Sequence, residues 1–68
     1  MKVFMYEAKI INLSEVKYID TFLENKMCAS IRFHMKGEND ETVFLKNILN
    51  TKVPEILQEC YEIMKKED

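Results

Sequence analysis

Apolar and polar residues alternate most regularly over the sequence CASIRFHM, residues 28–35. The odd positions from Ala29 to Met35 are apolar, and Arg32 and His34 lie between them. A repeat of two is typical of a strand with one buried face, because successive side chains point to opposite sides of a sheet. We therefore expect a strand whose face away from the core carries Cys28, Ser30, Arg32, His34 and Lys36.

A hairpin is expected around this strand. Residues 37–40 (Gly-Glu-Asn-Asp) have the composition of a turn, and residues 42–46 resume with β-branched and aromatic side chains. If Lys36 pairs with Thr42, Phe44 lies on the outer face, whereas a shift of one residue turns Phe44 inward. We favour the first register because it groups the apolar side chains of both strands in the core.

The first twelve residues also alternate, which predicts a strand over 1–12 with its even positions toward the core. These inward positions are Phe4, Tyr6, Ala8 and Ile10. Val3 and Met5 are apolar residues of the opposite face, so a helix or a second molecule must cover them. We expect Val3 and Met5 to belong to a dimer interface.

Residues 14–26 fit two different elements. Ser14 is a suitable helix N-cap, and the residues that would form one helical stripe are Val16, Ile19 and Leu23, with Met27 beyond them. The β-branched and aromatic content of the segment favours a strand instead. In a strand, however, Asp20 and Glu24 would share a face with the apolar residues Val16, Tyr18 and Phe22. We prefer the helix for that reason.

The C-terminal segment has the clearest helical pattern. Thr51 or Val53 can cap it, Pro54 suits its first turn, and Glu62 and Lys66 form an i, i+4 pair. One face is apolar and comprises Val53, Ile56, Leu57, Cys60, Tyr61, Ile63 and Met64. We expect this face to pack on the sheet.

These elements predict the α+β class. The expected order is β-α-β-β-α, with amphipathic helices packed on a mixed or antiparallel sheet in two layers; if residues 14–26 form a strand, the order becomes β-β-β-β-α. We find no repeat, linker or low-complexity segment, so residues 1–68 are expected to form a single domain.

Composition limits the classes of function. A chain of 68 residues buries only about 60% of its unfolded surface, so its core is marginal. The net charge of −2 neither requires nor excludes a nucleic-acid partner. Cys28 and Cys60 are far apart in sequence and form no CxxC motif, so we expect two reduced thiols, with a disulfide or intermolecular bridge as the alternative. The apolar run of residues 3–6 is too short for a signal peptide or membrane span, so we expect a cytoplasmic protein.

The outer face of the hairpin carries the only candidate site. It combines basic residues with an aromatic ring and comprises Arg32, His34, Lys36, Phe44 and Lys46. Cations bind phosphates and a ring can stack on a base, so this face fits a single-stranded nucleic acid. A solvated or partner-covered face explains the same pattern, and no paired aromatics of RNA-recognition type support the nucleic acid.

Catalytic and metal-binding patterns are absent from the sequence. There is no nucleophile beside a base in a known motif, no glycine-rich phosphate loop and no cluster of Cys and His, so we expect no enzyme, metal site or cofactor. The sequence predicts a small interaction module, acting as a homodimer through a protein–protein interface. Single-stranded nucleic-acid binding is the alternative.

Overall fold

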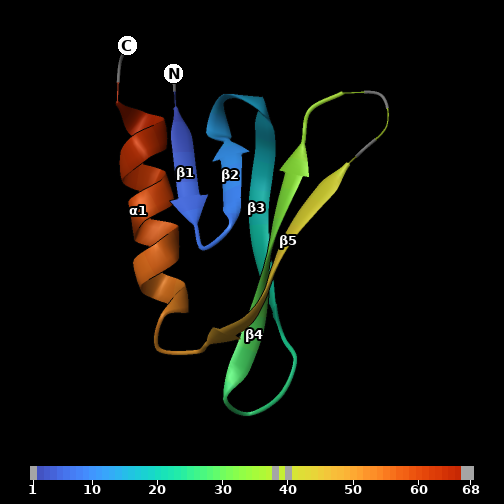
Figure 1. The fold of residues 1–68 in the computed structure, drawn as a ribbon, viewed down its shortest axis with the longest axis vertical. Coiled ribbons are helices and arrows are strands. Elements are labelled where there is room, and N and C mark those ends of the chain that lie inside the picture. Colours follow the sequence, from blue (N-terminus) through green and yellow to red (C-terminus); the bar gives the residue numbers. More distant parts are fainter. Residues whose placement is uncertain (1, 38, 40, 67–68) are drawn as a thin grey trace.

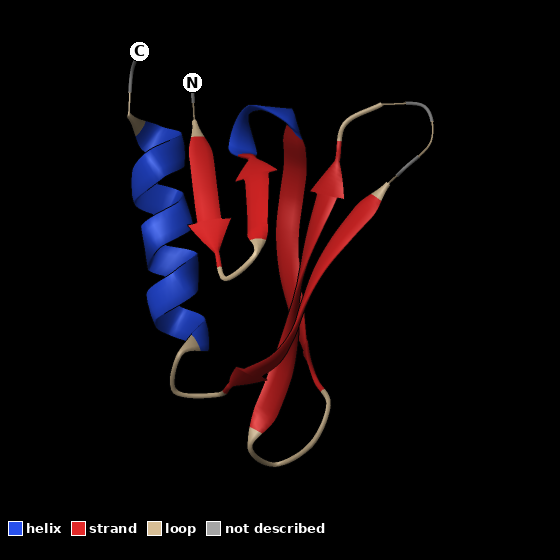
Figure 2. Cartoon of the chain, viewed as in Figure 1, coloured by secondary structure: helices blue, strands red, loops and turns tan. Residues whose placement is uncertain are grey.

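Residues 2–37, 39 and 41–66 are described in the computed structural model. β1 (Val3–Tyr6) and β2 (Lys9–Asn12) form a two-stranded antiparallel sheet. The second sheet is antiparallel in the order β3-β4-β5, and α1 follows it in the chain (Figures 1 and 2). These elements are β3 (Val16–Leu23), β4 (Cys28–Met35), β5 (Thr42–Leu49) and α1 (Val53–Lys65).

The arrangement belongs to the α+β class, but the predicted order β-α-β-β-α is wrong. The described residues contain five strands and one α-helix, which is C-terminal. The alternative order with four strands predicted β3 correctly and missed the division of the first strand into β1 and β2.

The predicted helix over residues 14–26 is replaced by a short 3-10 turn, η1 (Leu13–Glu15), followed by β3. The Asn12 side chain caps η1 by accepting a hydrogen bond from the Ser14 backbone N–H at 3.1 Å, so Ser14 is not the cap. Asp20 does share a face with Tyr18 and Phe22, as the strand required. Its carboxylate is satisfied there by side chains of β4, which removes the objection to a strand.

A tight turn at Glu7 and Ala8 divides the predicted first strand. Tyr6 pairs with Lys9, and Glu7 has a positive φ of 52°. The turn exchanges the inward and outward positions: Ile11 is 3% exposed and Ile10 is 71% exposed. The prediction that Ala8 and Ile10 face the core is therefore wrong, whereas that for Phe4 is confirmed.

The β4–β5 hairpin keeps the predicted faces with a different register. His34 pairs with Thr42 and Arg32 with Phe44, two residues away from the predicted pairing of Lys36 with Thr42. A shift of two residues leaves every side chain on its face. Glu38 and Asp40 of the predicted turn lie outside the described residues.

A bulge lets β5 continue beyond the predicted end of its strand. The register with β4 shifts between Ala29 and Ile31, and Asn47 adopts a φ of 58°. The extra residue on the bulged strand shifts the alternation of inward and outward side chains by one position, so that Ile48 faces inward in place of Asn47. Leu45 and Ile48 are consequently both buried.

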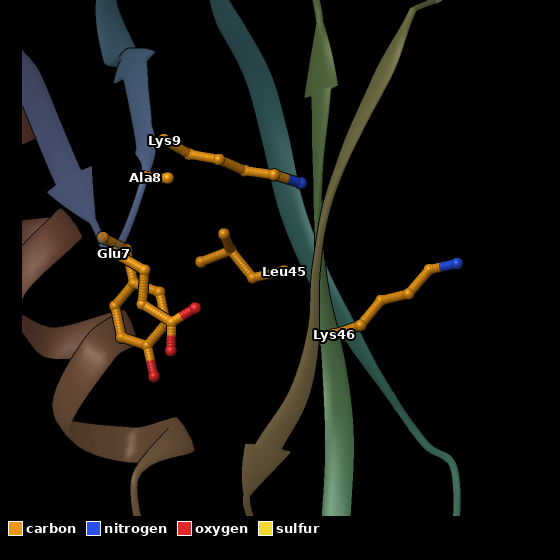
Figure 3. Close-up of a pocket in the computed structure, with 6 residues that line it drawn as sticks. Glu7, Ala8, Lys9, Leu45 and Lys46 are labelled. Carbon is orange, nitrogen blue, oxygen red and sulfur yellow. The ribbon is translucent and has the colours of Figure 1, made fainter.

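The core lies on one face of the β3-β4-β5 sheet, which we call the inner face. Phe4 of β1 stacks on Phe33 of β4 with ring centroids 6.3 Å apart, so the β1–β2 hairpin packs against this face. Ile56 and Cys60 of α1 join the same cluster. Figure 3 shows Leu45 directed from β5 toward the β1–β2 turn and Lys46 directed the opposite way.

The cover of the inner face is incomplete. In Figure 1 the lower ends of β3 and β4, with the loop between them, extend beyond α1 and the β1–β2 hairpin. Leu23, which pairs with buried Ala29 at this end, is accordingly 72% exposed. The inner face of the β3-β4-β5 sheet therefore retains exposed apolar area at this end.

The helix confirms most of the sequence prediction. Pro54 lies in its first turn, Ile56 and Cys60 are buried, and Tyr61 is exposed although it was expected on the packed face. Lys52 precedes the helix without a side-chain cap, so neither Thr51 nor Val53 caps it. The amino group of Lys2 donates to the Met64 carbonyl at 2.8 Å and ties the chain's start to α1.

Matched substitutions of two neighbouring residues test the β1–β2 turn. We expect Ile11→Val to lower the free energy of unfolding by about 0.5–1.5 kcal/mol, because it removes a buried methyl group. Ile10→Val should change it by less than about 0.5 kcal/mol. Urea unfolding of both variants measures the difference, and a larger loss for Ile10→Val would contradict the observed faces.

Candidate functional site

The face of the β3-β4-β5 sheet opposite the core is called the outer face here. The cross-strand pairs Tyr18 with His34, Asp20 with Arg32, and Arg32 with Phe44 place their side chains on this common side. Aromatic and charged groups therefore alternate across it. Its residues are Tyr18, Asp20, Phe22, Ser30, Arg32, His34, Thr42, Phe44 and Lys46.

An ion-pair cluster lies at the centre of the outer face. Arg32 donates through Nε and one terminal nitrogen to the two carboxylate oxygens of Asp20, at 2.8 and 2.7 Å. Nε2 of His34 lies 3.1 Å from Oδ1 of Asp20. The hydrogen bonds from Arg32, and then His34, lower the pKa of Asp20, although partial burial opposes the shift. The two-point contact fixes the plane of the guanidinium.

Aromatic rings flank this cluster on both sides. The Tyr18 ring stacks on the His34 imidazole, with centroids 4.2 Å apart and an angle of 16° between the planes. The Arg32 guanidinium lies 4.9 Å from the centre of the Phe22 ring, and the Lys46 amino group lies 5.7 Å from that of Phe44. The face is thus a connected array of rings and charges.

A polar contact secures the end of the face near the β3–β4 loop. Ser30 is completely buried, and its hydroxyl donates to the carboxylate of Glu24. In the same loop the Asn25 side chain accepts from the backbone N–H groups of Met27 and Cys28, at 2.8 and 2.9 Å. These bonds hold the loop against the sheet beside Phe22, which pairs with Ser30.

The structure brings together four of the five residues predicted for this site. Arg32, His34, Phe44 and Lys46 share the outer face, with Phe44 partly buried. Lys36 lies at the end of β4, where its amino group donates to the Ser14 carbonyl at 3.2 Å and its backbone N–H to that of Glu15 at 2.7 Å. Lys36 therefore contacts η1 and not the array.

Three residues of the array were missed by the sequence prediction. Tyr18, Asp20 and Phe22 belong to the segment that was predicted to be a helix. Tyr18 is 52% exposed and Phe22 is 40% exposed. The signal that could have found them was the strand alternative for this segment, which places all three on one face.

The predicted dimer residues Val3 and Met5 lie on the small β1–β2 sheet. Met5 is exposed and pairs with Ile10, which is also exposed, whereas Val3 is partly buried. α1 does not cover Met5, although Met5 borders a shallow hollow beside the residues Lys52, Glu55 and Glu59. The role of Val3 and Met5 in a dimer stays a prediction.

An open hollow and two thiols are further features of the described residues. Within residues 2–37, 39 and 41–66 no group of three or more His, Cys, Asp or Glu side chains is placed to hold a metal ion. A hollow of about 430 Å³ borders Tyr18, His34 and Thr42, and it opens to solvent. Cys28 and Cys60 are free thiols, and burial, with a smaller effect of Glu59, raises the pKa of Cys60 to about 11.

Comparison of the chain with protein-family models, with curated proteins and with solved structures found no match. No helix among the described residues has the length and apolar character needed to cross a membrane.

Titration of Asp20 tests the ion-pair cluster. We expect its carboxyl pKa to lie below the ordinary value of 3.8, chiefly because Arg32 donates to the charged form. A lowered native pKa stabilises the fold above the unfolded pKa, and this contribution is lost as pH falls through the native value. Carbon-13 NMR titration should show the pKa rising in Arg32→Gln, with little change in the matched variant Lys46→Gln. An Asp20 pKa unaffected by Arg32→Gln would contradict the cluster.

Proposed function

We propose that this protein is a small non-enzymatic binding module that acts as a homodimer in the cytoplasm and recognises another protein through the outer face. The observation that carries the proposal is the array of Tyr18, Phe22 and Phe44 around the Asp20–Arg32 pair. The array lies opposite the core, so it can be covered by a partner without disturbing the packing of the sheet.

The chemistry of the array supports a protein partner. Tyr, Phe and Arg are enriched in protein interfaces, and Tyr and Arg recur among the residues that dominate binding energy. Arg32 is already fixed between Asp20 and Phe22, so little side-chain entropy is lost when a partner covers it. A partner also need not neutralise the guanidinium, because Asp20 already does so.

Affinity capture with substituted protein tests this function. We expect the tagged wild-type protein to retain a protein from a lysate of its native cell, after nuclease treatment and in moderate salt. Phe22→Ala combined with Phe44→Ala should reduce that retention by about tenfold or more, because rings at interface centres contribute about 2 kcal/mol each. Circular dichroism must show that the double variant is folded.

Tyr61→Ala is the matched control, because Tyr61 is an exposed ring on α1 that lies beneath Lys65 rather than on the outer face. It should bind as the wild type does. Equal losses in both variants, or an unchanged double variant, would rule out the outer face as the binding site.

Single-stranded nucleic acid is the second candidate ligand of the outer face. The observation in its favour is that three aromatic rings occur together with Lys46 and Arg32, since bases stack on rings and phosphates attract cations. The bond from Arg32 to Asp20 weighs against it, because this cation is already neutralised. The array therefore has more stacking surface than available positive charge.

Fluorescence anisotropy with labelled oligonucleotides at low salt separates the two candidates. A nucleic-acid site should bind more tightly in Asp20→Asn, which releases Arg32, and more weakly in the combination of Arg32→Ala with Lys46→Ala. Loss of two phosphate contacts should also reduce the salt dependence, by a slope of about 0.7 per contact. The protein-binding proposal expects no binding above background in any of these variants.

A further inference from the structure

β3 has an unpaired edge. Among the described residues its only strand neighbour is β4, and no backbone hydrogen bond joins residues 19–23 to any described segment other than β4. Thr21, Phe22 and Leu23 are all exposed. Such an edge presents free N–H and C=O groups that can pair with a further strand.

The opposite edge of the sheet, along β5, is protected. The Lys9 amino group, which Figure 3 shows extending from β2 toward the larger sheet, donates to the Phe44 carbonyl. Further along β5, the bulge with Asn47 interrupts the regular backbone. A lysine and a bulge are the devices by which proteins block pairing at an edge. β3 has a bulge as well, between Val16 and Tyr18, but its remaining part is regular.

We propose that a second copy of this chain pairs with residues 19–23 of β3, antiparallel and about a two-fold axis at Thr21, to form a continuous six-stranded sheet. Opposite residues of an antiparallel pair share a face. A two-fold axis normal to the sheet must therefore lie midway between one residue and the same residue of the partner strand. The charges along β3 then decide which residue it is.

Neighbouring registers are unfavourable. An axis at Asp20 would place this carboxylate opposite its own copy, and an axis at Phe22 would place Asp20 opposite the partner's Glu24. Like charges directly opposite one another destabilise a strand pair. An axis at Ile19 would extend the pairing into the bulge between Val16 and Tyr18, where the backbone is irregular.

The register centred on Thr21 avoids these conflicts. It places Thr21 opposite the partner's Thr21, and threonines opposite one another form a favourable pair. On the inner face, Ile19 lies opposite the partner's Leu23, so each exposed Leu23 gains an apolar neighbour. On the outer face, Asp20 lies opposite the partner's Phe22, and no like charges lie directly opposite one another.

Pairing in this register joins the two outer faces into one surface. Phe22 of both copies then lies near the two-fold axis and Tyr18 lies at the ends of the ladder, so the array on each copy continues into the other. A ladder of five residues per strand is small for a protein interface, so we expect a dimer that dissociates in the micromolar range. The pairing would hold whatever the outer face binds, so it does not rest on the proposed protein partner.

Sedimentation equilibrium of the wild type and two charged variants tests the edge. We expect the wild type to approach a dimer at high micromolar concentration, and Thr21→Glu to raise the dissociation constant by about tenfold, because two carboxylates then meet on the axis. Met5→Glu on the β1–β2 sheet tests the competing interface predicted from the sequence, and we expect it to dimerise as the wild type does. A monomeric wild type, or dissociation by Met5→Glu alone, would overturn the proposal.

Disulfide trapping tests the position of the axis. In a Cys28→Ser background, Thr21→Cys should oxidise to a covalent dimer, because the two introduced sulfurs face each other across the axis. Phe22→Cys should form much less, since each introduced cysteine lies opposite Asp20. Buried Cys60, with its pKa raised to about 11, supplies little thiolate for competing bonds. Equal trapping at both positions would exclude this register.

Discussion

The fold depends on covering one face of the three-stranded sheet. The short chain provides the β1–β2 hairpin and α1 for this cover. Phe33 and Ile31 at the centre of β4 are completely buried, and the β1–β2 hairpin and α1 supply the groups that cover them. A single sheet with one apolar face is stable only when that face packs against another element. No described element remains for the other side of the sheet, so the outer face is left bare.

The bare face is stabilised by contacts within the sheet. Asp20 and Arg32 are cross-strand partners and also a two-point ion pair, so backbone pairing and side-chain chemistry favour the same register. A partly exposed pair of this kind contributes modestly to stability. The pair also places the Arg32 guanidinium against the Phe22 ring, while His34, which contacts the same carboxylate, stacks on Tyr18.

Sequence patterns predicted the elements whose signals are local. The alternation around Phe33 and the helical period around Ile56 both led to the correct element and the correct buried face. The failures arose where distant or unusual interactions decide. The charge of Asp20 argued against a strand over residues 16–23. Its partner Arg32 comes from the neighbouring strand, so it can be identified only from the strand pairing.

The other failures have similar causes. Glu7 and Ala8 are not typical turn residues, so nothing in the sequence indicated that the inward positions change from Phe4 to Ile11 across the turn. In the candidate site, the residues from β4 and β5 were found by alternation. Those from β3 were missed because their element was assigned wrongly, and with them the carboxylate that neutralises Arg32.

Site-specific photo-crosslinking in the native cell tests the central claim, that the outer face is where this protein meets its partner. A photoreactive phenylalanine analogue in place of Phe44 should give a discrete crosslinked product that contains another protein. The same analogue in place of Tyr61, the exposed ring on α1, should give none. Crosslinking at Tyr61 and not at Phe44 would place the binding surface on the helix and contradict the account.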